Sequence, residues 1–172
     1  MNLQASDFQL FQIPELFRQD RTTLDTRWKE LQREAHPDKF AAQGAAAQRV
    51  AMQWSVRINE AYQRLKDPVA RAAYLCELHG APINAESNTA MPAAFLMQQM
   101  ELREALDESQ TEENLDEISH KSTHLLHEQL SIAEQLIDQT KDYAAAAQAV
   151  RALLFIQKFQ QDIDRRFSLL GQ

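Results

Sequence analysis

The tripeptide His36-Pro37-Asp38 has residue types that could do chemistry in a loop. An imidazole near a carboxylate could act as an acid–base pair. Here a rigid proline separates the two side chains and no nucleophile lies nearby in sequence, so a catalytic dyad is excluded. The rigid proline suits docking, and the alternative is an ordinary turn in which Asp38 is a local cap.

A second set of candidate chemical groups is His120, His124 and His127, which share one face of a predicted helix. Two histidines at i and i+4 can bind zinc, and three could bind nickel or zinc weakly. No His-Glu-x-x-His pattern and no second cluster completes a metal site. We interpret this face as solvated and predict no metal and no cofactor. A metal-dependent enzyme built on these histidines is the alternative from another functional class.

The single cysteine, Cys76, excludes an internal disulfide and any Cys-x-x-Cys zinc site. It follows the apolar residues Tyr74 and Leu75 near the end of a predicted helix. The sequence therefore predicts a small, buried thiol without chemistry of its own.

The elements that position the loop are two long helices. The chain has 172 residues, 44% of them hydrophobic and only three of them glycine, a helix-forming composition without period-2 alternation. Pro37 ends the first helix, and Asp67-Pro68 ends the second and caps a short third helix that stops at Gly80. If the two long helices pack antiparallel, residues 36–40 lie at the tip. Their apolar stripes are Leu24, Trp28, Leu31 and Ala35, and Trp54, Ile58, Ala61, Tyr62 and Leu65.

The second half of the chain predicts a separate bundle. Turn-forming residues fill positions 80–91, and three amphipathic helices joined by short loops follow, with Thr111 as the cap of the middle one. The division is residues 1–79, a linker at 80–91 and a three-helix bundle at 92–172. The stripes are Phe95, Leu102 and Leu106; Leu115, Ile118, Ser122, Leu125, Gln129, Ile132 and Leu136; and Ala149, Leu153, Ile156, Gln160, Ile163, Phe167 and Leu170.

The first half resembles the J domain over about residues 6–75. The resemblance is carried by His36 to Phe40 between two helices, by residues 59–62 and Leu65 one helix later, and by Asp67-Pro68. It implies that His36, Pro37, Asp38 and Lys39 dock on an ATPase chaperone of the DnaK/HscA type. Asp38 would pair with a partner arginine, and Pro37 would lower the cost of ordering the loop.

The helix before the motif departs from the usual strongly basic J-domain helix. The resemblance makes Arg27, Lys29 and Arg33 candidates for electrostatic steering of the chaperone. Acidic residues are interleaved with them, and Ala35 stands where an aromatic residue commonly precedes the motif. These departures indicate a specialised partner, or weaker attraction to a generic one.

The chain as a whole resembles the HscB family, the J proteins of bacterial iron–sulfur cluster assembly. The resemblance rests on residues 8–11, 36–40, 71–80 and above all 95–108, and it weakens between residues 110 and 140. It implies an all-α, L-shaped protein that binds the scaffold IscU and stimulates ATP hydrolysis by HscA without being an enzyme itself. A J-domain adaptor for a different client is the alternative. The implied scaffold-binding residues are Leu96, Met97, Met100, Glu101, Glu104, Glu108 and Phe155.

Helical periodicity independently sets part of this segment apart. At about 100° per residue, Leu96, Met97 and Met100 lie on a different face from Leu102 and Leu106. They form either an exposed apolar patch with an acidic edge or part of a wide core face covered by a neighbouring helix.

Charge and hydropathy limit the classes of partner. The net charge is −7, and residues 80–172 hold 7 Lys/Arg against 15 Asp/Glu, so neither half has the basic footprint of nucleic-acid binding. No apolar run approaches the ~20 residues that cross a bilayer, and no secretion signal begins the chain. We expect a cytoplasmic protein that binds neither nucleic acid nor membrane.

Overall fold

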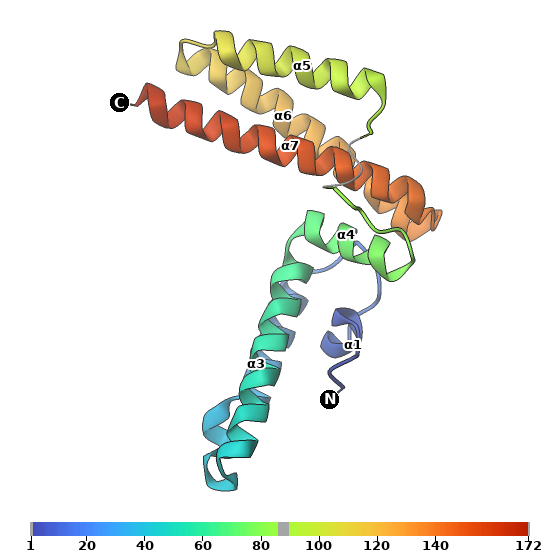
Figure 1. Cartoon of the computed structure of the whole chain (residues 1–172), viewed down its shortest axis with the longest axis vertical. Coiled ribbons are helices and arrows are strands. Elements are labelled where there is room, and N and C mark those ends of the chain that lie inside the picture. The colour runs from blue at the N-terminus through green and yellow to red at the C-terminus, as the bar shows by residue number, and fades with distance from the viewer. Residues whose placement is uncertain (1, 86–89, 172) are drawn as a thin grey trace. The chain divides into compact units, whose positions relative to one another are not determined.

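The computed structural model describes residues 2–85 and 90–171, and every regular element in them is a helix, as predicted (Figure 1). Residue contacts divide the chain into two compact units, Met1–Leu75 and Cys76–Gln172. The division falls inside helix α4 (Pro68–Leu78). Residues 86–89 of the predicted linker lie outside the described residues. In the part described, no helix is both long enough and apolar enough to span a bilayer.

The first unit is built on a pair of helices joined by a loop, residues 35–44. Helix α1 (Asp7–Phe11) precedes α2 (Arg21–Glu34), a 3-10 segment η1 (Pro37–Gln43) and α3 (Ala45–Lys66). The predicted stripes of α2 and α3 face each other, with Leu24, Leu31, Ile58 and Leu65 almost fully buried. Trp28 stacks on Tyr62 with ring centroids 4.7 Å apart, so the pair joins the middle of α2 to the C-terminal part of α3.

The ends of these helices follow from capping residues. Asp20 accepts a hydrogen bond from the backbone N–H of Thr22 and begins α2. Asp67 accepts one from the N–H of Val69, and Pro68 is the first residue of α4, as the sequence predicts. The starts of α2 and α4 are therefore specified by local residues.

The second unit is a three-helix layer of α5 (Ala93–Glu108), α6 (Glu112–Glu134) and α7 (Tyr143–Leu170). A π-helical turn η2 (Gln135–Gln139) ends α6, and Thr111 caps its start by accepting from the N–H of Asn114. Helices α6 and α7 form the main contact, and α5 lies along them (Figure 1). Helix α5 adds only two buried residues, Leu102 and Leu106, to the core.

The buried stripes of α6 and α7 drift from the predicted spacing. The sequence places Ile132 and Leu136 in the core, whereas Ile132 is exposed and Ala133 and Ile137 are buried. On α7, Phe159 takes the core position predicted for Gln160. A straight α-helix has 3.6 residues per turn, so its buried face moves by about 20° per heptad away from a fixed 3-4 pattern.

Candidate functional site

The loop at the tip of the first unit is held in shape by His36. Its Nδ1 atom accepts a hydrogen bond from the backbone N–H of Asp38 at 3.2 Å, which makes His36 the N-cap of η1. The N–H of Lys39 donates to the carbonyl oxygen of His36 at 3.0 Å, and Pro37 fixes the first position of the turn. The sequence therefore builds a rigid turn from the motif's own residues.

This turn leaves the carboxylate of Asp38 almost fully in solvent. Its side chain is 92% exposed, and Oδ2 lies 3.7 Å from His36 Nδ1. An imidazole nitrogen that accepts from a backbone N–H carries no proton, so this separation is not an ion pair in the neutral form of His36. The carboxylate is thus available to a cation from outside the chain.

The three basic residues proposed for steering, Arg27, Lys29 and Arg33, differ in their surroundings. Arg27 is half-buried and used within the chain: Nε donates to the carbonyl of Phe11 at 2.8 Å, and its other groups bind Gln12 and Glu30. Lys29 and Arg33 are exposed and make no hydrogen bond or ion pair among the residues described. The guanidinium of Arg27 thus ties α2 to α1, while its role in steering a partner stays a prediction.

In the second unit, α5 carries an exposed apolar patch. Met97 and Met100 are 62% and 63% exposed, and Leu96 is 39% exposed. Phe155 of α7 is 36% exposed and packs edge-on against Phe95, with ring centroids 5.9 Å apart. We call Leu96, Met97, Met100 and Phe155 the apolar patch. Among the described residues of the second unit, no neighbouring helix covers it, which argues against the alternative of a wide core face.

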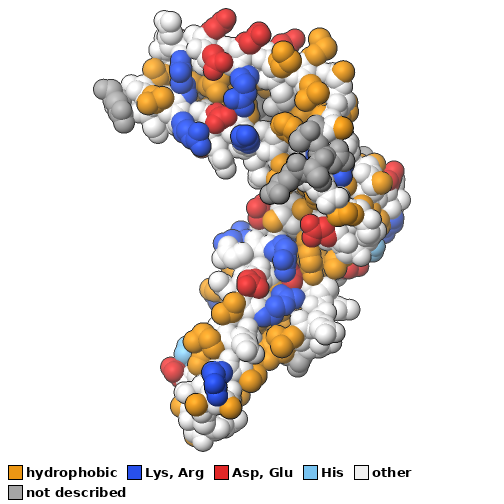
Figure 2. Space-filling model, in the orientation of Figure 1, with side chains coloured by type: hydrophobic (Ala, Val, Ile, Leu, Met, Phe, Trp, Pro, Cys, Tyr) orange, Lys and Arg blue, Asp and Glu red, His pale blue; other side chains and the backbone are white. Residues whose placement is uncertain are grey.

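An acidic edge borders the apolar patch. Glu101, Glu104 and Glu108 are exposed and form no ion pair in the part of the chain that is described. Figure 2 shows apolar side chains over the first half of α5 and acidic ones over its second half. Arg103, in contrast, donates to Asp162 of α7 at 3.2 Å and lies over the Phe159 ring, so it holds α5 to the bundle. The arrangement suits a partner with an apolar surface and basic residues beside it.

Known proteins resemble the chain over almost its whole length. Residues 91–164 match the family described as the HSCB C-terminal oligomerisation domain. The co-chaperone protein HscB homolog of Burkholderia cenocepacia is 43% identical, over 99% of this chain and 98% of that protein. The chaperone HscB from Vibrio cholerae superposes with a TM-score of 0.82 at 34% identity, over 96% of this chain and 99% of that one. The human co-chaperone protein HscB superposes with a TM-score of 0.90 at 26% identity, over 95% and 83%.

The chain belongs to the HscB family of co-chaperones. Its J-type motif and its α5 patch are therefore features of a co-chaperone, and they lie in different compact units of this HscB-family chain.

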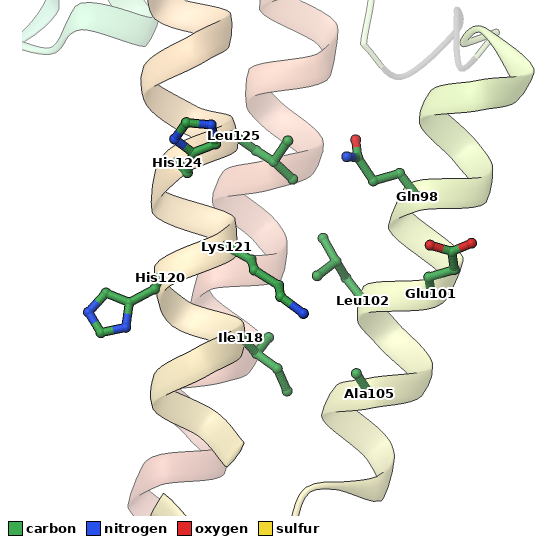
Figure 3. A pocket seen from close by; sticks show the side chains of 9 residues that line it. All are labelled: Gln98, Glu101, Leu102, Ala105, Ile118, His120, Lys121, His124 and Leu125. Carbon is green, nitrogen blue, oxygen red and sulfur yellow. The ribbon is translucent and has the colours of Figure 1, made fainter. Parts of the chain in front are cut away.

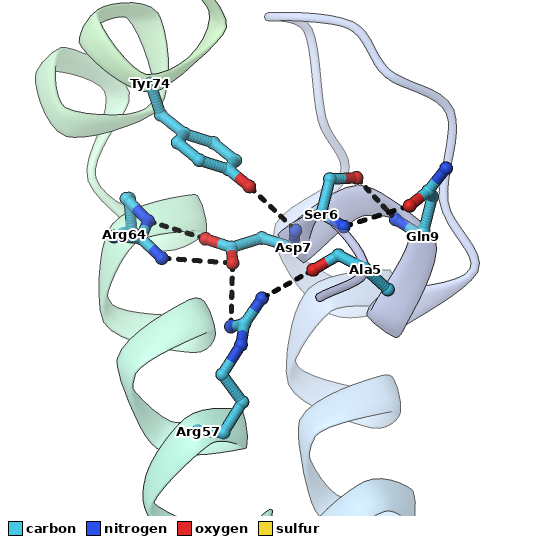
Figure 4. Close-up of polar contacts among 7 residues, drawn as sticks. All are labelled: Ala5, Ser6, Asp7, Gln9, Arg57, Arg64 and Tyr74. Carbon is cyan, nitrogen blue, oxygen red and sulfur yellow. Dashed lines mark hydrogen bonds and ion pairs between the residues drawn. The ribbon is translucent and has the colours of Figure 1, made fainter. Parts of the chain in front are cut away.

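One polar cluster of this HscB-family chain is not evident in its sequence. Asp7 is fully buried, and its carboxylate pairs with Arg64 at 2.6 Å and with Arg57 at 2.8 Å (Figure 4). Its backbone N–H donates to the hydroxyl of Tyr74 at 2.9 Å. Ser6 caps α1 by accepting from the N–H of Gln9. The cluster fixes α1 to α3 and α4, and only the Ser6–Gln9 capping box has a local sequence signature.

A cavity lies beside the tip loop, residues 36–40, and Ala35 is one of the residues that line it. This alanine is buried, and a cavity of about 370 Å³ opens between the end of α2, η1 and the start of α3. Phe40, Val50 and Trp54 contribute to its apolar lining. A small residue at position 35 leaves this space unfilled.

The surroundings of the three histidines and of the cysteine favour neither metal binding nor thiol reactivity. His120, His124 and His127 are exposed, and no group of three or more His, Cys, Asp or Glu side chains within residues 2–85 and 90–171 is placed to hold a metal ion. Cys76 is fully buried, and burial raises the pKa of its thiol to about 11. At neutral pH that thiol is protonated and unreactive, as the sequence predicts.

Proposed function

We propose that this HscB-family co-chaperone serves iron–sulfur cluster assembly by binding an IscU-type scaffold and delivering it to an HscA-type chaperone. The apolar patch with its acidic edge would hold the scaffold, and the tip loop would stimulate ATP hydrolysis by the chaperone. The co-chaperone itself hydrolyses nothing, and we place its action in the cytoplasm.

The exposed carboxylate of Asp38 is the observation that carries the proposal. A charge displayed on a turn that is already rigid loses little conformational entropy when it meets a partner. An arginine of the chaperone would bind it through charge-assisted hydrogen bonds. Lys29, Arg33 and Lys39 are exposed and would steer the approach, and Arg27 would add its positive charge from a half-buried position.

We assign scaffold binding to α5 because the apolar residues of its patch face solvent, whereas an apolar helix face is usually buried in a core. Methionine side chains adapt to the shape of a partner, and the three unpaired glutamates would select one with basic residues.

The test is a chaperone ATPase assay with three additions: the co-chaperone, the apo-scaffold, and both together. We expect stimulation by the co-chaperone alone and a further increase when the scaffold is present. No stimulation would overturn the role of the loop. Stimulation without any binding of the apo-scaffold would instead indicate an adaptor for a different client.

A further inference from the structure

A groove separates α5 from α6 in the second unit. It encloses about 500 Å³, and its floor is formed by Leu102, Ile118 and Leu125 (Figure 3). Ala105 is the residue of α5 that faces this space one turn after Glu101, and its small side chain leaves the groove open. The groove is wide enough for one apolar side chain of a bound polypeptide.

The two walls of the groove carry opposite charges that are not paired with each other. Glu101 lies on the α5 wall and Lys121 on the α6 wall (Figure 3). Among the described residues neither forms a hydrogen bond or an ion pair, although both line the same space. Two unpaired charges beside an apolar floor favour an occupant that has an apolar centre and charged groups of both signs.

The groove is continuous with the apolar patch. Glu101 belongs to the acidic edge of the patch and also lines the groove. Met97 precedes Glu101 by one helical turn, and Met100 is its neighbour in sequence. A partner bound to the apolar patch would therefore reach the groove by extending across α5 alone.

We propose that the groove between α5 and α6 binds an extended segment of the client scaffold. The segment would place one apolar side chain against Leu102, Ala105 and Ile118. An acidic residue of the segment would face Lys121, and a basic residue would face Glu101. This inference rests on the proposed scaffold-binding function and adds to it a second contact region with a defined charge pattern.

Two variants test the groove without changing the apolar patch. Ala105→Phe fills the space, and Lys121→Glu makes both walls acidic. Each should weaken binding of the apo-scaffold, measured by titration calorimetry, by about tenfold or more, because a like charge or a blocked pocket opposes the same contact. Lys141→Glu and Ala144→Phe, at exposed positions outside the groove, are the matched controls and should bind as the unmodified protein does.

Thermal melting accompanies each titration, and Lys121→Glu remains informative if Ala105→Phe fails to fold, because Lys121 is exposed. Carbodiimide coupling of the complex should also join Lys121 to an acidic residue of the scaffold.

The outcomes separate the two proposals. If the unmodified protein does not bind the scaffold, the proposed function fails. If it binds, and loses binding when Leu96, Met97 and Met100 are truncated but not when the groove is changed, the groove proposal alone is overturned. Loss of self-association in Lys121→Glu with unchanged scaffold binding would assign the groove to a second copy of the chain and would also overturn it.

Discussion

The tip loop, residues 36–40, and the apolar patch present opposite kinds of surface. The loop displays one carboxylate on a turn held by His36 and Pro37, so its contribution comes from a charge in a fixed place. The patch displays flexible methionines on a helix that buries only Leu102 and Leu106. A rigid charge is sensitive to any change of chemistry, whereas an adaptable apolar surface is sensitive mainly to loss of area. The two regions should therefore respond differently to conservative and to truncating substitutions.

The largest expected effect is on the loop. Asp38→Ala should abolish stimulation of an HscA-type chaperone, because losing a charge-assisted contact at an interface costs about 2–5 kcal/mol, or at least about thirtyfold in affinity. The side chain is 92% exposed and belongs to no apolar stripe, so circular dichroism should not change. Asp38→Asn, which keeps the shape and removes the charge, should lose nearly as much. Full stimulation by a folded Asp38→Ala protein would refute the role of the loop.

The next effect is on the apolar patch. Leu96→Ala, Met97→Ala and Met100→Ala together should strongly reduce scaffold binding, while stimulation of the chaperone by the co-chaperone alone persists. Because all three side chains are exposed, each substitution should change stability by no more than about 0.5 kcal/mol. Replacing both methionines by leucine is the control, and it should retain most of the binding since apolar area is kept. A well-folded triple variant that still binds the scaffold would place the client elsewhere.

These contrasts also explain which features the sequence could predict. The starts of α2 and α4 depend on Asp20, Asp67 and Pro68, whose effects are local, and the tip loop depends on Pro37, which disfavours continuation of α2. Helical period alone places Met97 and Met100 on a different face of α5 from Leu102 and Leu106, but it left open whether that face is exposed or covered.

Other features depend on contacts between residues that are far apart in the sequence, which no local pattern predicts. Asp7 contacts Arg57, Arg64 and Tyr74, which follow it by 50 residues or more, and Arg27 donates a hydrogen bond to a carbonyl oxygen of α1. The error at Ile132 has a different origin, since small departures from a fixed repeat accumulate along a long helix. The groove between α5 and α6 depends on how closely two helices approach, which periodicity does not specify.

The buried cluster gives a prediction about stability that concerns the first unit alone. Asp7→Ala leaves Arg57 and Arg64 without their carboxylate and should lower the free energy of unfolding by about 3 kcal/mol, the lower end for a broken buried pair, because both arginines keep some solvent contact. Hydrogen exchange should show loss of protection in α1 and α3 and unchanged protection in α6 and α7. Asp116→Ala, at an exposed position of α6, is the control. Equal protection of α1 in both variants would show that the cluster does not anchor this helix.

The smallest expected effect is that of replacing the histidines of α6. It would show that these side chains of the second unit are not needed for stimulation of the chaperone or for scaffold binding. Replacing His120, His124 and His127 together by glutamine should change neither stimulation of the chaperone nor scaffold binding. All three positions are exposed, so the change in stability should stay within a few tenths of a kcal/mol per site, and glutamine forms helices slightly better than histidine.

This variant also bears on metal binding and on the groove. His120 and His124 are among the residues that line the groove on its α6 side, but neither belongs to its apolar floor. The contacts proposed for the client depend on Lys121, Glu101 and the apolar floor, and glutamine leaves all of them in place. Metal analysis of the purified proteins completes the test, because a stoichiometric zinc that disappears in the triple variant would give this face a chemical role. A loss of scaffold binding without any metal would instead extend the client surface across α6, beyond the charge pair that now defines it.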